Sequence, residues 1–275
     1  MPIRHDAERR WVEMKFELPG TVEQVWQAVA TGPGISAWFT PTTVEEKEGG
    51  AIAFDMGDGM VSPATITAWE PPHRFSYVEK EWNGDAPPVS TDVFVEKDAD
   101  GRTVVRMTHT MESAESEWDE HMEGFEAGWP TFFLILSIYL RDFPEQPAAI
   151  AWARGIYPGP ADEGWNRLIS GLGLEQAAIG EACVSAQGAP RLAGTVLERR
   201  HGDNGVNDMQ IRLTEPYPGV ATMGTCVWEG TTLAMVGLYL WGDQAAEAAS
   251  EFHPRLKAWM DELFPMPDTP APEGA

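Results

Sequence analysis

Cysteine and basic residues are scarce in this chain of 275 residues. Its two cysteines, Cys183 and Cys226, cannot form a disulfide framework, so we expect both to be reduced and buried as small hydrophobic residues. Only 19 Lys and Arg residues oppose 43 Asp and Glu residues, which gives a formal net charge of −24. A field of this sign repels nucleic-acid phosphates and anionic lipid headgroups, so the sequence predicts no nucleic-acid partner and no membrane partner.

Long apolar segments are absent as well. The longest apolar run, residues 129–140, has 12 residues, contains Pro130 and Thr131, and is too short to cross a bilayer. The first ten residues have no apolar core, which predicts that they are not a secretory signal. We therefore expect a cytoplasmic protein.

The short motifs of common catalytic sites are also missing. No two histidines have the spacing of a zinc site, and neither a Gly-x-Ser-x-Gly elbow nor a Gly-x-x-x-x-Gly-Lys-Ser/Thr loop occurs. The sequence therefore predicts no catalytic residue, no metal and no cofactor. An acid–base pair of His109 or His121 with Glu112 or Glu123 remains an alternative.

What is present is typical of a globular protein with a substantial core, since 43% of the residues are hydrophobic and 12 are Trp. Residues 10–18 are expected to form a strand. Thr21 and Gln24 then form a capping-box pattern at the start of a helix that residues 32–34 should end. A second short helix is expected at 35–39.

From residue 42 to residue 111 the apolar period changes to two, the pattern of an antiparallel meander. The six strands are expected at 43–48, 51–56, 61–70, 74–82, 91–97 and 103–110. A helix follows at 116–141, with apolar side chains at alternating spacings of four and three residues. Pro130 lies inside it, so we expect a kink or break near Gly128. This order predicts a helix-grip fold, in which a curved sheet wraps around a long C-terminal helix.

The rest of the chain is predicted to be a second copy of this helix-grip unit. A shift of 139 positions places Pro19 on Pro158 and Trp26 on Trp165. The copy is expected to have a strand at 151–157, a helix at 162–172, strands at 181–185, 191–200, 208–214, 220–228 and 231–241, and a final helix at 245–263. Because it is shorter, we expect one strand fewer and a smaller interior. The fold class is thus α+β, with helix-grip domains at 1–145 and 146–264 and a disordered tail at 265–275.

Residues 10–142 resemble the SRPBCC (START/Bet v 1-like) superfamily, and within it the Hsp90 ATPase activator homologue 1-like (AHSA1-like) group. The resemblance rests on Thr21-Val-Glu-Gln-Val-Trp26, Trp38-Phe-Thr40, residues 64–75 and Gly128-Trp129. Residues 150–263 resemble the superfamily only through the repeat. The resemblance implies a cavity between sheet and helix that holds an apolar ligand in many members. It implies no single activity, because members include lipid carriers, hormone receptors, polyketide cyclases and co-chaperone domains.

Nine aromatic side chains fall where the sheet and the long helix should converge. These candidate ligand-binding residues are Trp38, Phe39, Phe54, Trp69, Phe75, Tyr77, Trp82, Trp129 and Phe133. They are predicted to line a pocket for a small hydrophobic molecule, or alternatively to fill the space as ordinary core. Two further alternatives are a chaperone-accessory module with a protein partner, and an enzyme of the polyketide cyclase or aromatase type. The enzyme would need polar side chains such as Thr65, Tyr77, Thr108 or His109 in the cavity.

Overall fold

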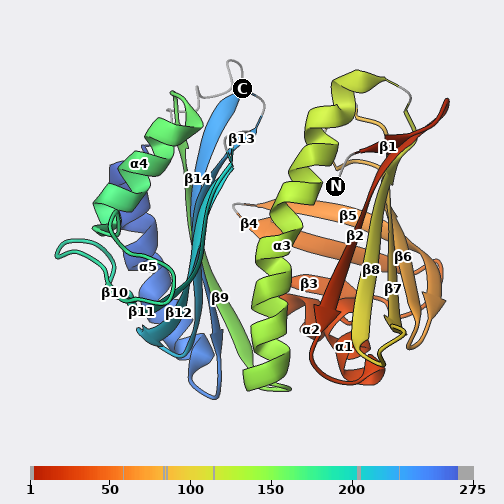
Figure 1. Ribbon diagram of the computed structural model, residues 1–275, viewed down its shortest axis with the longest axis horizontal. Coiled ribbons are helices and arrows are strands. Elements are labelled where there is room, and N and C mark those ends of the chain that lie inside the picture. The colour runs from red at the N-terminus through yellow and green to blue at the C-terminus, as the bar shows by residue number, and fades with distance from the viewer. Residues whose placement is uncertain are drawn as a thin grey trace, which may run out of the picture. The chain divides into compact units, whose positions relative to one another are not determined.

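The computed structural model describes residues 3–265 except 58, 83, 85, 114, 203–205 and 229. The chain divides into two compact units, Met1–Gln146 and Pro147–Ala275. Each unit has its own antiparallel sheet and its own helices (Figure 1). The α+β fold class with two helix-grip domains is confirmed. The expected disordered tail, apart from its first residue, lies outside the described residues.

The first unit contains an eight-stranded antiparallel sheet in the order β1-β2-β8-β7-β6-β5-β4-β3. Its strands are β1 Arg4–His5, β2 Arg10–Leu18, β3 Thr42–Val44, β4 Ala51–Gly57, β5 Met60–Glu70, β6 Arg74–Glu79, β7 Val89–Lys97 and β8 Thr103–Met111. Strands β3 to β8 pair in chain order, and β2 joins the meander at β8. This is the meander that the period of two predicted.

The helices of this unit are α1 Val22–Ala30, α2 Gly32–Ser36, the short η1 Ser116–Trp118 and α3 Asp119–Asp142. The capping box is formed, because Thr21 Oγ1 accepts from the Gln24 amide at 3.2 Å and Gln24 Oε1 accepts from the Thr21 amide at 2.9 Å. The expected second short helix is present, but it spans Gly32–Ser36 rather than 35–39. Thr31 Oγ1 caps the Gly34 amide at 3.1 Å, so the glycine-proline segment that should end α1 instead begins α2.

Helix α3 lies along the sheet of its unit and is continuous through Pro130, so of the kink or break expected near Gly128 the break does not occur (Figure 1). Two contacts hold α3 to β2. The rings of Phe16 and Phe133 stack, and the buried Arg10 pairs with Asp119 in the first turn of the helix. Arg10 Nε also donates to the carbonyl oxygen of Ser113 at 3.2 Å.

A β-bulge in β5 changes which side chains face α3. Ile66 pairs with Tyr77 of β6, and Trp69 pairs with Phe75, but Thr67 between them has no partner in the register. This one extra residue lets Ile66 and Trp69, three positions apart, face the same side of the sheet. Trp69 thereby contacts Phe75 and the buried Trp26 of α1, with centroids 5.5 Å and 5.2 Å away.

The second unit has a six-stranded antiparallel sheet in the order β10-β11-β12-β13-β14-β9. Its elements are β9 Ala148–Tyr157, α4 Ala161–Leu172, β10 Ala182–Val184, β11 Ala193–His201, β12 Asn207–Glu215, β13 Gly219–Trp228, β14 Thr231–Trp241 and α5 Ala245–Leu263. Counted from β9, this order matches the order β2-β8-β7-β6-β5-β4-β3 of the first unit, with one strand fewer. Trp165 of α4 is buried, as Trp26 of α1 is.

Among the described residues, no helix combines the length and the apolar character needed to cross a membrane. The same part of the chain contains no cluster of three or more His, Cys, Asp or Glu side chains that could hold a metal ion. Both cysteines are free. Cys183 is buried and Cys226 is half-buried, and burial raises the pKa of both thiols.

Candidate functional site

The nine predicted aromatic side chains form one network in the first unit. Trp38 contacts Phe39, Trp129 and Phe133, with ring centroids 5.4 to 6.3 Å apart. The network continues from Phe39 through Phe54, Tyr77 and Phe75 to Trp69, with neighbouring centroids 5.3 to 6.0 Å apart. Trp82 joins it through Phe125, 5.6 Å away, and His109. The structure therefore brings all nine side chains together.

The network is buried at one end of α3 and half-buried at the other. In the C-terminal half of α3, Phe133, Leu136 and Tyr139 are buried. In the N-terminal half, Phe125 and Trp129 remain half-buried, as do Phe39 and Trp82 beside them. Two half-buried members, Phe125 and Phe132, were missed as site residues. The signal was present, because they share the apolar stripe of the helix with Trp129.

A row of polar side chains crosses the sheet beneath these rings. Tyr77 of β6 pairs with Thr91 of β7, and Thr91 pairs with His109 of β8. Thr91 Oγ1 lies 2.9 Å from His109 Nδ1, and the Thr91 hydroxyl also hydrogen bonds Tyr77. The His109 ring stacks on Phe125 and Trp129, so the row faces α3. All three polar side chains are buried.

The electrostatic state of the row follows from this burial. Desolvation lowers the pKa of His109 to about 3, so its imidazole is neutral. Burial also raises the pKa of Tyr77, with a smaller contribution from the nearby Glu79 carboxylate. His109 Nε2 is buried and has no hydrogen-bond partner within the described part of the chain. The row therefore presents neutral hydrogen-bonding groups within an aromatic surrounding.

Glu79 extends the polar surface by one step along β6. It lies two residues after Tyr77, hence on the same face, and its Oε1 accepts from Ser62 Oγ at 2.6 Å. Burial raises the pKa of Glu79, and the Ser62 hydrogen bond partly opposes that shift. Sequence reasoning missed Thr91, Glu79 and Ser62. The sequence held a signal for Glu79 only, because Phe75, Tyr77 and Glu79 alternate along one strand and therefore face the same side of the sheet.

The alternative of an acid–base pair finds no support at His109. Its ring hydrogen bonds a hydroxyl, Thr91, while Glu112 and Glu123 are exposed. His121 is half-buried, and its ring lies 5.4 Å from the rings of both Trp82 and Trp118.

The four polar residues considered for an enzyme divide between the two faces of the sheet. Thr65 is exposed, and Thr108 is half-buried on the face opposite His109. Only Tyr77 and His109 face α3. The enzyme alternative keeps two inward polar groups and stays a prediction.

The second unit has no such row at the corresponding place. Val12 pairs with His109 in the first unit, and Ala151 lies 139 positions after Val12. From Ala151 this row continues across the sheet through Leu238, Ala221 and Ile211, and all four aliphatic side chains are fully buried in the core. A sheet of this topology therefore does not require polar side chains at these positions.

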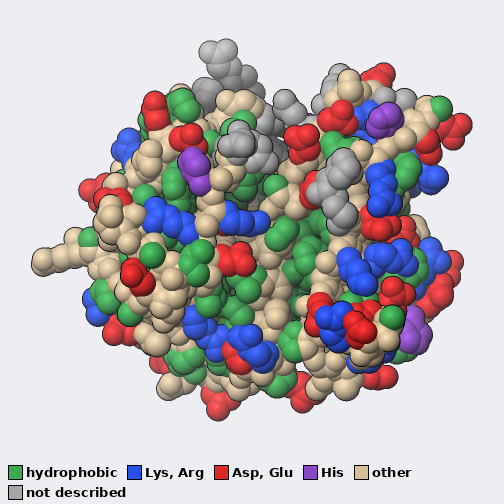
Figure 2. All heavy atoms as spheres, viewed as in Figure 1, with side chains coloured by type: hydrophobic (Ala, Val, Ile, Leu, Met, Phe, Trp, Pro, Cys, Tyr) green, Lys and Arg blue, Asp and Glu red, His purple; other side chains and the backbone are tan. Residues whose placement is uncertain are grey.

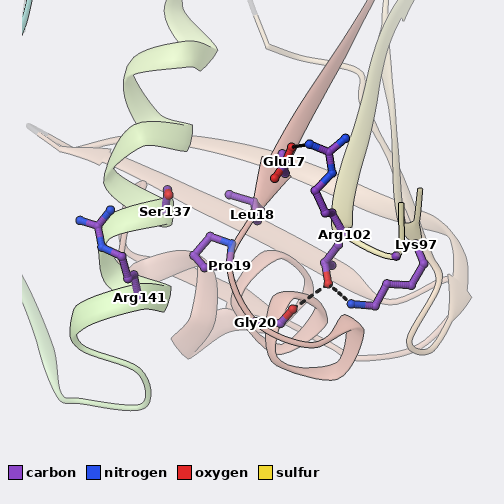
Figure 3. A pocket seen from close by; sticks show the side chains of 10 residues that line it. Glu17, Leu18, Pro19, Gly20, Lys97, Arg102, Ser137 and Arg141 are labelled. Atoms are coloured by element: carbon purple, nitrogen blue, oxygen red, sulfur yellow. Dashed lines mark hydrogen bonds and ion pairs between the residues drawn. The ribbon is translucent and has the colours of Figure 1, made fainter. Parts of the chain in front are cut away.

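A pocket of about 480 Å³ opens elsewhere in the first unit, near the β7–β8 turn and the end of α3 (Figure 3). None of the nine aromatic residues lines it. It is lined by Glu17, Leu18, Pro19, Gly20, Lys97, Gly101, Arg102, Thr103, Ser137 and Arg141. Its basic groups already have partners, since Arg102 pairs with Glu17 at 2.7 Å and Lys97 donates to Thr103 Oγ1 at 2.7 Å. We assign it no function.

Comparison with known proteins concerns mainly the first unit. Residues 19–141 match the model of the family described as Activator of Hsp90 ATPase homolog 1-like protein. No curated protein matches the chain.

Three solved structures illustrate the likeness. Protein MLL2253 from Mesorhizobium loti is 20% identical, covering 49% of this chain and 98% of its own, with a TM-score of 0.44. DynU16, of the dynemicin biosynthetic locus, is 17% identical over 92% of this chain and 96% of its own, with a TM-score of 0.42. Aha1 from Colwellia psychrerythraea is 20% identical over 48% of this chain and 96% of its own, with a TM-score of 0.40. These scores support no argument about function. The match of residues 19–141 confirms the resemblance of the first unit to the Activator of Hsp90 ATPase homolog 1-like group that was seen in the sequence.

Proposed function

We propose that the first unit binds a small hydrophobic molecule between α3 and the face of the sheet that carries Tyr77, Thr91 and His109. The observation that carries this proposal is the half-burial of the aromatic rings on the N-terminal half of α3. Phe125 and Trp129 contact the inward-facing His109, yet both keep part of their surface exposed. Rings that face a sheet are normally covered by its core, so exposed area at this place favours a ligand that completes the packing.

The energetics favour such a ligand. Phe39, Trp129 and Phe132 are half-buried and contact one another, with centroids 4.9 to 6.0 Å apart. Apolar area removed from water contributes roughly 25 cal/mol per Å². A molecule of naphthalene size that covers parts of these rings gains both this area and aromatic contacts.

The composition of the second unit's core supports the assignment of ligand binding to the first unit. Its core is filled mainly by aliphatic side chains, among them Leu168, Ile211, Leu238 and Leu256, all fully buried. We therefore expect ligand binding in the first unit, with the second unit as an internal control in the same chain.

Photoaffinity labelling with an apolar aryl diazirine tests the proposal on the full chain. We expect saturable labelling, mapped by mass spectrometry to residues 74–82 and 118–133 and displaced by unlabelled naphthalene. Phe39→Glu should abolish it, since a charge would enter the half-buried network. The matched control is Phe94→Glu, because Phe94 is half-buried on the other face of β7 beside Arg74 and Arg106. Labelling that does not saturate, or that is confined to residues 147–265, overturns the proposal.

A second candidate, an accessory to a chaperone, is favoured by the description of the matched family. In this case the acidic surface of the first unit would contact a basic face of the partner. On the face shown in Figure 2, Asp and Glu side chains are interspersed with Lys and Arg rather than gathered in one patch. Co-purification with Hsp90 at low ionic strength, lost at high salt, would support this candidate. No retention at low salt removes it.

A further inference from the structure

The two ring nitrogens of His109 differ in their contacts. Nδ1 hydrogen bonds Thr91, whereas Nε2 is buried and has no hydrogen-bond partner among the residues that the structure describes. A buried polar atom with no hydrogen bond destabilises the folded protein, so such atoms are few in native structures and often mark a place where another molecule binds. His109 itself is only 2% exposed.

The surroundings of His109 limit how a molecule can approach it. Phe125 and Trp129 stack against the ring, with centroids 4.8 Å and 5.6 Å away and planes tilted by 25° and 16°. These stacked rings cover the imidazole, which leaves the ring edge that carries Nε2 as the place for a further polar contact.

The fold does not require this arrangement. In the second unit, Leu238 takes the place of His109 in the corresponding row, with Ala221 beside it. An aliphatic row avoids burying polar atoms and would stabilise the first unit better. The polar row therefore indicates a binding role rather than a structural one.

We propose that the ligand of the first unit is an apolar molecule with one hydroxyl group, and that this hydroxyl hydrogen bonds Nε2 of His109. The inference rests on the proposed function and names the ligand's polar group. Thr91 is a positioning residue, since its hydroxyl holds Nδ1 and thereby orients the ring.

The chemistry of the row selects a neutral hydroxyl. A hydroxyl both donates and accepts, so it suits Nε2 whichever ring nitrogen carries the proton. A carboxylate is disfavoured, because the neutral imidazole offers no positive charge to pair with it in a buried place. A pure hydrocarbon would leave Nε2 unpaired.

Equilibrium dialysis of the full chain with two matched probes tests this inference. The probes are 1-naphthol and 1-methylnaphthalene, which differ by a hydroxyl in place of a methyl group. The quantity measured is the ratio of their dissociation constants. His109→Phe keeps an aromatic ring but removes Nε2, and we expect the preference for 1-naphthol to fall about 3- to 10-fold, the worth of one hydrogen bond. Thr108→Val, on the outer face of the same strand, should leave the preference unchanged.

The outcomes separate this inference from the proposed function. If neither probe binds the wild-type chain, both are overturned. If both probes bind but His109→Phe keeps the wild-type preference, the hydroxyl inference alone is overturned. If His109→Phe binds neither probe, Thr91→Val decides, because it should lose preference for 1-naphthol while still binding 1-methylnaphthalene; an unchanged preference overturns the inference.

A spectroscopic measurement distinguishes a ligand-binding role of His109 from a purely structural one. In nitrogen-15 spectra, 1-naphthol should shift the Nε2 resonance of His109, identified by its loss in His109→Phe. The methyl analogue should not shift it. Equal shifts with both probes overturn the inference.

Discussion

Phe16 of β2 and Phe133 of α3 stack face to face, with ring centroids 3.7 Å apart and planes tilted by 7°. The contact joins the strand next to β8 to the C-terminal half of α3, where Leu136 and Tyr139 are also buried. The opposite half of α3 carries its aromatic side chains half-buried. The aromatic side chains of the two halves of one helix therefore differ in burial, and the ligand that we propose would contact the less buried half.

Truncating aromatic side chains in the two halves should cost different amounts of stability. Phe133 is 3% exposed, so Phe133→Ala should lower the free energy of unfolding by about 3–5 kcal/mol. Trp129 is half-buried, and Trp129→Ala should cost about 1–3 kcal/mol despite the larger ring. Urea denaturation of the two variants measures both. Equal losses would contradict the division of α3 into two halves.

The ion pair of Arg10 and Asp119 should stabilise the start of α3. The Arg10 side chain is 4% exposed, so removing its partner leaves a buried, uncompensated charge. We expect Asp119→Asn to lower the free energy of unfolding by about 2–4 kcal/mol. The control is Asp261→Asn, which breaks the exposed pair with Lys257 and should cost less than about 1 kcal/mol. A loss at Asp119 no larger than that of the control would refute the anchoring role.

Burial of His109 should make the first unit less stable in acid. Its pKa is about 3 in the folded protein against an ordinary value of 6.5, so the unfolded chain binds the proton first as pH falls. Stability from this residue is complete above pH 6.5 and is lost progressively toward pH 3. At pH 4.5 the loss should be about 2–3 kcal/mol. Urea denaturation from pH 7 to pH 4.5 should show His109→Phe losing less stability than wild type. Parallel pH profiles would disprove the expectation.

Glu79 should have the opposite dependence on pH. Because burial raises its pKa, the neutral acid is favoured in the folded protein, and its stabilising effect is lost as pH rises through the folded pKa. Glu79→Gln keeps a polar group that can accept from Ser62 and removes the charge. The variant should melt at a higher temperature than wild type near pH 7, and the difference should shrink toward pH 4.5. Thermal melts at both pH values check this, and a less stable variant at pH 7 would argue against it.

Sequence periodicity predicted most elements because each is set locally. The bounds of β2, β4 and α5 follow from apolar spacing and turn residues within the segment itself. The second helix was misplaced because Gly32, Pro33 and Gly34 usually end a helix. The deciding contact is the Thr31 hydroxyl, which accepts from Gly34 and donates to the Gln27 carbonyl at 2.7 Å.

The aromatic residues of the candidate site were predictable from the sequence, but the polar row was not. Large apolar residues mark inward positions within each strand by alternation. Tyr77, Thr91 and His109 lie on three strands, and only the cross-strand register makes them neighbours. In the sequence of its own strand, Thr91 has no feature that distinguishes it from other strand residues. No local pattern indicates that its hydroxyl hydrogen bonds a buried histidine.

The bulge at Thr67 has a consequence for how this interior could change in evolution or in the laboratory. Deleting that single residue would remove the bulge and restore strict alternation in β5, with Ile66 and Trp69 two positions apart and both still facing inward, Trp69 opposite Phe75. A one-codon deletion at Thr67 would thus straighten the strand and leave both its partners and the lining of the first unit in place.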